Sequence, residues 1–98
     1  MKQLDLKVDG MLSGTGIRDI TSGEFVEPKE IGISASVTQR ISDWLARYWE
    51  AHYHDFENEE ENKHLDREGV EIAKLIRLEV PDARVRYFSD ASMEWITF

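Results

Sequence analysis

The chain has 98 residues, no cysteine and a formal net charge of −8 at neutral pH. Its length predicts a single domain over residues 1–98, and the lack of cysteine excludes disulfides, thiolate zinc sites and thiol nucleophiles. The excess of acidic residues argues against a nucleic-acid partner, because affinity for a phosphate backbone comes mostly from Lys and Arg.

The first part of the chain predicts short strands. Leu4, Leu6 and Val8 alternate with polar residues, which is the period of two expected when one face of a strand is buried. Residues 17–20 and 24–26 flank a Thr-Ser-Gly sequence at 21–23, a pattern typical of a hairpin with a three-residue loop. We therefore expect three strands before residue 28.

Residues 34–61 predict an aromatic amphipathic helix that runs into a block of negative charge. Ser34 is a suitable N-cap for it. Trp49 and Phe56 lie at the margin of its apolar face, and Tyr53 lies on the opposite, polar side. The residues that share one sector about 100° wide, and that we expect to face the core, are Val37, Ile41, Trp44, Leu45, Tyr48 and His52.

A second helix is expected after the acidic residues. Residues 55–63 contain no apolar residue after Phe56 and form either a solvated linker or a frayed helix end. Asn58, with Glu61 three residues later, fits the N-cap of this helix, and Asn62 is an alternative N-cap. The apolar stripe consists of Leu65, Gly69, Ile72, Ala73 and Ile76. Because Gly costs about 1 kcal/mol relative to Ala inside a helix, we expect Gly69 to admit a bulky ring from the first helix.

The last part of the chain returns to strand patterns. Pro81 ends the second helix, and residues 83–88 alternate so that Val85 and Tyr87 share one face. Residues 93–98 form either a short final strand or a packed tail. The predicted fold class is α+β, with a small sheet of three to five strands packed against two antiparallel helices in the order β-β-β-α-α-β.

Nearly all of the net charge lies in one segment. Residues 1–49 and 62–98 each hold six basic and seven acidic side chains, whereas residues 50–61 hold six acids and no Lys or Arg. Aromatic rings inside a charged rim are typical of protein interfaces, although a solvated acidic loop without a partner is the simpler alternative. The predicted surface for a basic protein partner consists of Trp49, Tyr53, His54, Asp55, Glu57, Glu59, Glu60 and Glu61.

Two further hypotheses compete with a binding protein. His52, His54, Asp55 and His64 could serve a small metal-dependent hydrolase, since imidazole and carboxylate groups bind zinc. Helical spacing argues against joint chelation by His52 and His54, which point about 160° apart while the helix persists. The third hypothesis is a homodimer that buries the aromatic edge. We expect no cofactor, because the Gly-rich segment at 13–16 completes neither a dinucleotide fingerprint nor a P-loop.

Cellular location is inferred from the absence of membrane and export patterns. No apolar run approaches the roughly 20 residues that cross a bilayer. The amino-terminal residues alternate between polar and apolar types, unlike a signal peptide. We therefore expect a cytoplasmic protein with no membrane contact.

Several stretches carry a resemblance to a known family. They are Gly-Thr-Gly-Ile-Arg-Asp at 14–19, Thr-Ser-Gly-Glu-Phe-Val-Glu-Pro at 21–28, Glu-Gly-Val-Glu-Ile-Ala-Lys-Leu-Ile at 68–76 and Arg-Val-Arg-Tyr-Phe-Ser at 84–89. From residue 14 onward the chain resembles small acidic bacterial immunity proteins of polymorphic-toxin and contact-dependent growth inhibition loci. The resemblance implies a cytoplasmic protein that binds the C-terminal toxin domain of a cognate effector and blocks its active site. Many such toxins are nucleases with basic clefts.

Overall fold

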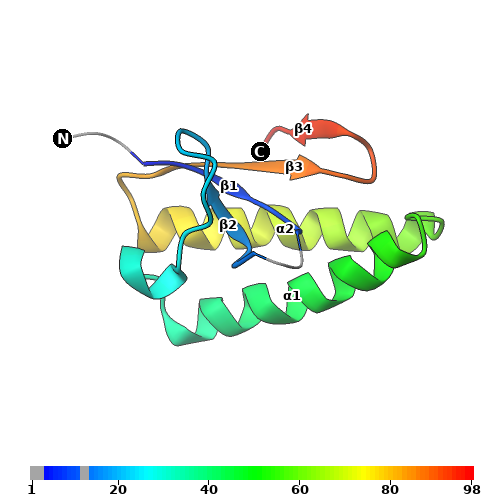
Figure 1. Cartoon of the computed structure of the whole chain (residues 1–98), viewed down its shortest axis with the longest axis horizontal. Coiled ribbons are helices and arrows are strands. Elements are labelled where there is room, and N and C mark those ends of the chain that lie inside the picture. The colour runs from blue at the N-terminus through cyan, green and yellow to red at the C-terminus, as the bar shows by residue number, and fades with distance from the viewer. Residues whose placement is uncertain (1–3, 12–13) are drawn as a thin grey trace.

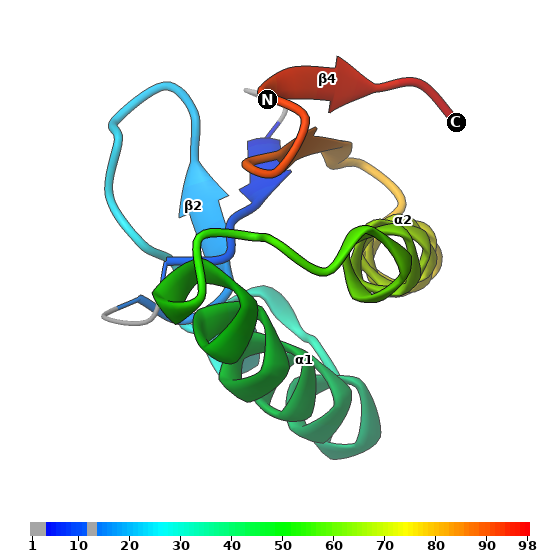
Figure 2. The ribbon, with the colours of Figure 1, turned by 90° about the vertical axis from the view of Figure 1, so that its right-hand side faces the viewer.

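The structure is a computed structural model that describes residues 4–11 and 14–98. Its elements, in chain order, are β1 (Asp5–Val8), β2 (Ile17–Asp19), the 3-10 helix η1 (Pro28–Ile31), α1 (Ala35–Tyr53), α2 (Glu59–Glu79), β3 (Arg84–Ser89) and β4 (Glu94–Ile96). The sheet order is β2-β1-β3-β4, with β1 and β3 parallel and the two outer pairs antiparallel. Both helices lie below β3 and β4 in the views of Figures 1 and 2, and a mixed sheet packed with two helices confirms the α+β class.

The strand alternation explains how the sheet faces the helices. Leu6 and Val8 of β1 and Val85 and Tyr87 of β3 are fully buried, while their neighbours in sequence lie on the opposite face. Leu4 is an exception to the predicted alternation, because β1 begins after it and its side chain is 37% exposed.

The predicted hairpin is only partly formed. Phe25 pairs with Arg18 through a single bridge, and the N–H groups of Asp19 and Val26 donate to the opposite arm. The expected third strand at 24–26 is therefore wrong as a strand. Pro28 lies at the start of η1 immediately afterwards and has no N–H with which to extend the pairing.

The first helix is shorter than predicted but its buried stripe is almost entirely correct. Ser34 caps α1, and its Oγ accepts a hydrogen bond from the N–H of Val37 at 3.3 Å. The prediction for His52 is wrong: this side chain is exposed, because the last turn of α1 extends past the core, where the imidazole lies edge-on to the ring of Phe56. Helix α1 ends at Tyr53 rather than at residue 61.

The second helix begins inside the acidic segment. Asn58 caps α2, and its side chain accepts from the N–H of Glu61 at 3.1 Å. The predicted stripe from Leu65 to Ile76 is buried. Gly69 does admit a ring, but it is Tyr87 of β3 and not a residue of α1, so that part of the prediction is wrong. The reason is that this face of α2 packs on β3.

Trp44 joins the two helices and the sheet at the centre of the core. Its ring is fully buried between Tyr48 and Tyr87, with centroid separations of 4.9 and 6.0 Å. Its Nε1–H donates to the carbonyl of Leu65 at 2.9 Å, so the one polar atom of the indole is satisfied. Within residues 4–11 and 14–98, neither α1 nor α2 is apolar enough over its length to cross a membrane.

Candidate partner-binding surface

The turn between α1 and α2, which we call the acidic turn (residues 54–61), has a well-defined backbone. His54 is the C-cap that follows the last residue of α1, and its N–H donates to the carbonyl of Glu50. Asp55 and Phe56 follow with positive φ values of 55° and 54°, a left-handed conformation that is uncommon for residues other than glycine. The N–H of Phe56 donates to the carbonyl of Ala51 at 2.8 Å, which closes the end of the helix.

Phe56 anchors this turn to the core. Its ring packs edge-on against Tyr48 and His52, with centroids 5.6 Å away in both cases. Its carbonyl accepts a hydrogen bond from Nδ2 of Asn62 at 2.6 Å, while Asn58 caps α2 from the other side. Contacts from both helices therefore fix the backbone that carries the acidic side chains.

The acidic side chains occupy two different environments. Asp55 and Glu57 lie in the turn itself and are exposed. Glu59, Glu60 and Glu61 form the first turn of α2, where the unpaired N–H groups and the helix dipole favour negative charge. None of the five forms an ion pair with any residue of the ranges 4–11 and 14–98. Their charge is thus uncompensated at short range.

The two predicted binding rings lie on another side of α1. Trp49 and Tyr53 stack with centroids 5.3 Å apart and an interplanar angle of 16°, and Tyr53 is 68% exposed. Arg47, two residues before Trp49, forms an ion pair with Glu68 of α2. Because residues two apart on a helix point about 160° away from each other, Trp49 faces away from α2.

Ring contacts link some of the eight predicted residues, because Trp49 stacks on Tyr53 and the ring of Tyr53 lies edge-on to that of His54 at 5.4 Å. His54, Glu57 and Glu61 line a groove of about 360 Å³ between the end of α1 and the start of α2. The sequence interpretation missed the other lining residues of this groove, which are Arg47, Glu50, Ala51, Phe56, Asn58 and Asn62. The capping pattern at Asn58 was the one sequence feature that could have indicated a helix start, and hence a groove, at this point.

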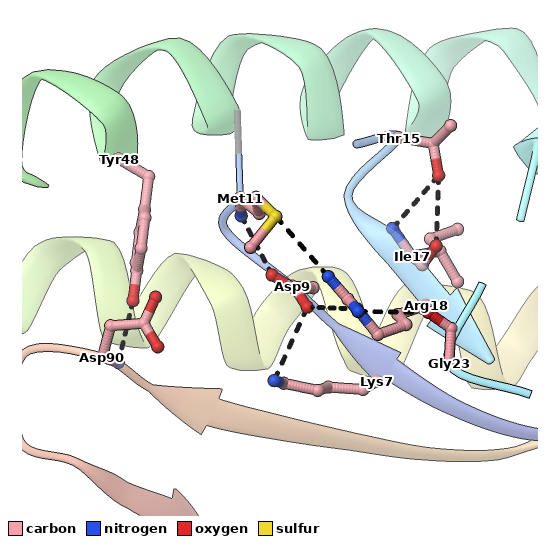
Figure 3. Close-up of polar contacts among 9 residues, drawn as sticks. All are labelled: Lys7, Asp9, Met11, Thr15, Ile17, Arg18, Gly23, Tyr48 and Asp90. Carbon is pink, nitrogen blue, oxygen red and sulfur yellow. Dashed lines mark hydrogen bonds and ion pairs between the residues drawn. The ribbon is translucent and has the colours of Figure 1, made fainter. Parts of the chain in front are cut away.

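Behind the acidic turn, a polar network joins α1 to the sheet (Figure 3). The hydroxyl oxygen of Tyr48 accepts a hydrogen bond from the N–H of Asp90 at 2.9 Å. Burial raises the pKa of this phenol above its ordinary value, so it remains protonated at physiological pH. Burial also raises the pKa of the half-buried Asp90 carboxyl, and the nearby Asp9 carboxylate raises it further.

Asp9 is the buried acid of this network, and two cations offset its charge. Its Oδ2 lies 2.8 Å from Nε of Arg18 and 3.5 Å from Nζ of Lys7, and its Oδ1 accepts from the N–H of Met11 (Figure 3). These contacts join β1, β2 and the connection between them. The Asp9 contacts therefore have a structural role, because they tie β1 to β2 and to the connection between the two strands.

The histidines do not form a metal site. His54 lies 3.9 Å from a carboxylate oxygen of Glu50, and His64 lies 3.4 Å from a guanidinium nitrogen of Arg67. In the part of the chain that the structure describes, no three His, Asp or Glu side chains are grouped so that they could hold a metal ion. The structure thus brings His52, His54, Asp55 and His64 into no common ligand set.

Comparison with known protein families identifies a match over most of the chain. Residues 2–90 match the family described as Serratia CdiI immunity protein-like. The match begins at residue 2 and thus includes the amino-terminal segment that the resemblance above leaves out, and it ends before β4. No curated protein matches the chain.

Proposed function

Because this chain belongs to the Serratia CdiI immunity protein-like family, we propose that it is a non-enzymatic inhibitor that binds and neutralises a toxin domain through the acidic turn and its neighbouring rings. The family match covers residues 2–90, which include α1, α2 and the turn between them. The proposal also includes three finer points. These are which residues bind the toxin domain, which reaction the toxin catalyses, and that the inhibitor acts in the cytoplasm.

The observation that carries the proposal is the confinement of charge to one end of the helix pair. Residues 50–61 hold −6 of the net −8, and they lie at the end of the molecule where α1 meets α2 (Figure 1). A field of one sign at one end of a protein orients an oppositely charged partner during approach and raises the association rate. A basic surface on the partner fits this field.

The helix dipole accounts for only part of the charge. Glu59, Glu60 and Glu61 suit the start of α2 whether or not the protein has a partner, since each is worth about 0.3–1 kcal/mol there. Asp55 and Glu57 lie outside the helix and gain no comparable stabilisation. A solvated acidic loop therefore explains these two residues poorly, whereas a binding surface explains all five.

The fixed backbone of the turn favours a binding role as well. Phe56, Asn58 and Asn62 hold it through ring packing and hydrogen bonds from both helices. A surface that is already ordered loses little conformational entropy when a partner binds. The exposed ring of Tyr53 adds apolar area of the kind that contributes most of the affinity at protein interfaces.

A nuclease is the toxin class that this surface fits best. Nucleases hold the phosphate backbone with Lys and Arg, so their clefts are basic. A row of carboxylates on a rigid turn can occupy such a cleft in place of the phosphates. The inhibitor then blocks the toxin by binding alone and needs no catalytic activity of its own.

The proposal is tested by the association rate between this protein and the toxin domain encoded beside its gene. The test variant carries Glu57→Gln, Glu59→Gln and Glu60→Gln, and the matched control carries Glu24→Gln, Glu27→Gln and Glu30→Gln, which are also exposed acids. Neutralising the acidic turn should slow association roughly tenfold or more at low salt, and the control should change it little.

One folding check and one outcome decide the question. Circular dichroism first checks that the test variant keeps α2, because two of its changes remove favourable charges from the first helical turn. If the folded variant associates as fast as the control variant, the acidic turn is not the interface, even if the protein still binds the toxin domain.

A further inference from the structure

A basic groove lies at the opposite end of α2 from the acidic turn. It has a volume of about 290 Å³ and is lined by side chains of β3, β4 and the last turn of α2, with no acidic residue among them. Glu59 and Arg77 are 18 residues apart on α2, or about 27 Å at 1.5 Å per residue. The groove is therefore separate from the proposed toxin-binding surface.

Three arginines give the groove its charge. Arg84 and Arg86 alternate with the buried Val85 and so point away from the helices, and Arg77 reaches the sheet edge from α2. Strand β4 ends at Ile96, and beyond it the carbonyl of Val85 accepts a hydrogen bond from Nη2 of Arg77 at 3.0 Å. The groove therefore lies where β4 ends beside β3, and the side chain of Arg77 lines one side of it.

The guanidinium groups are only partly compensated. Arg86 donates from Nη2 to both oxygens of Asp5 at 3.0 and 3.2 Å, but its buried Nε has no hydrogen-bond partner among the described residues. Arg84 forms no ion pair within those residues and is exposed. With Asp5 counted, the local formal charge is +2 in a protein whose net charge is −8.

Two aromatic rings complete the groove. The guanidinium of Arg77 lies 4.3 Å from the centroid of Phe98, and that of Arg86 lies 5.1 Å from the centroid of Trp95. Trp95 remains 49% exposed, although the ring of Phe88 also lies edge-on to it at 5.2 Å and Nζ of Lys7 lies 5.9 Å from its centroid. Residues 95–98 lie beyond the family match, which ends at residue 90.

We propose that this groove binds a free mononucleotide, with the phosphate at Arg84 and Arg86 and the base against Trp95. A phosphate monoester carries a charge near −2 at neutral pH, which matches the local charge, and its oxygens fit the planar donor geometry of arginine. A ligand with a single carboxylate carries a charge of −1 and would neutralise only half of the local charge. The net charge of −8 disfavours a long polyanion, so a single phosphate group is the better fit.

The test is a titration of the intact protein with AMP, followed by amide and indole NMR signals. AMP should shift the signals of residues 84–86 and 95–98 and leave those of the acidic turn unchanged. Inorganic phosphate should bind more weakly than AMP because it lacks the base, and adenosine should bind more weakly because it lacks the charge. A 5′-phosphorylated trinucleotide should bind no more tightly than AMP.

Variants assign the effect to the groove. Arg84→Gln should weaken AMP binding roughly tenfold, because a charge-assisted contact to the phosphate is lost, and Arg84 forms no ion pair within residues 4–11 and 14–98 that the change would remove. Arg40→Gln on α1 makes the same charge change at an exposed position outside the groove and should have no effect. The proposal is overturned by an absence of shifts at millimolar AMP, by equal affinity for inorganic phosphate, by tighter binding of the trinucleotide, or by equal losses in the two variants.

Discussion

Tyr87 of β3 occupies the space that a side chain at Gly69 of α2 would need, because a Cβ added at Gly69 would overlap the Cε1 atom of the tyrosine ring. The hydroxyl of Tyr87 donates to Oδ1 of Asp66 at 2.7 Å, one helical turn earlier on α2. The close approach of helix and strand is thus fixed both by the missing side chain and by a hydrogen bond.

Gly69→Ala should therefore destabilise the protein. Ala favours a helix by about 1 kcal/mol over Gly, but forcing a methyl group into a packed core costs about 1–3 kcal/mol. We expect a net loss of about 1 kcal/mol in the free energy of unfolding, measured by urea denaturation. Lys63→Ala, at an exposed position of the same helix, should change it by less than about 0.5 kcal/mol. Greater stability in Gly69→Ala would contradict the contact.

The Asp90 carboxyl should make stability depend on pH. Its folded-state pKa is raised by burial and by Asp9, so between the ordinary and the raised value the native state binds more protons than the unfolded state. Stability must then fall as pH rises through that window, and the loss remains at neutral pH. The positive charge of Lys7, and that of His52 when protonated, reduces the shift without reversing it.

Asp90→Asn tests this relation. The variant should be more stable than the parent at pH 7, by less than about 1 kcal/mol because the group is partly solvated, and the gain should disappear below about pH 3.9. Thermal unfolding at several pH values measures it. Asp82→Asn, at an exposed site, should show no such trend. A variant that loses stability at pH 7 would mean that the ionised carboxylate is favourable in the fold.

Tyr53→Ala should reduce toxin binding without affecting folding. The ring is 68% exposed and contacts Trp49 and His54 on its own helix end, so its removal should change the free energy of unfolding by less than about 0.5 kcal/mol. As an interface anchor, however, it should be worth about 2 kcal/mol in affinity, measured by calorimetry. Leu78→Ala is the matched control, since Leu78 is an apolar side chain on α2 that is 76% exposed. Equal small effects of the two variants would exclude Tyr53 from the interface.

The sequence predicted the helices well because their signals are local. The apolar spacing from Val37 to Tyr48 and the caps Ser34 and Asn58 depend only on neighbouring residues, and the structure confirms them. The partner of Gly69 could not be predicted in the same way. It depends on which face of α2 meets the sheet, and Tyr87 lies 18 residues further along the chain.

The candidate surface was predicted only in part. The charge of the segment 50–61 is visible in the sequence, but the left-handed backbone at Asp55 and Phe56 is not, because this conformation is uncommon for any residue other than glycine, even though Asp adopts it more often than most. That conformation lies between the end of α1 at Tyr53 and the start of α2 at Glu59. The alternation of polar and apolar residues in residues 83–88 did not predict the basic groove either, because the groove forms where β4 ends at Ile96.

The most direct test of the central claim is protection of living cells. The cognate toxin domain is expressed in cells that also produce the parent protein, the variant with Gln at positions 57, 59 and 60, or the control with Gln at 24, 27 and 30, all at matched levels. If the acidic turn binds the toxin domain, the parent and the control should restore growth and the acidic-turn variant should not. Full protection by the folded acidic-turn variant would contradict the central claim.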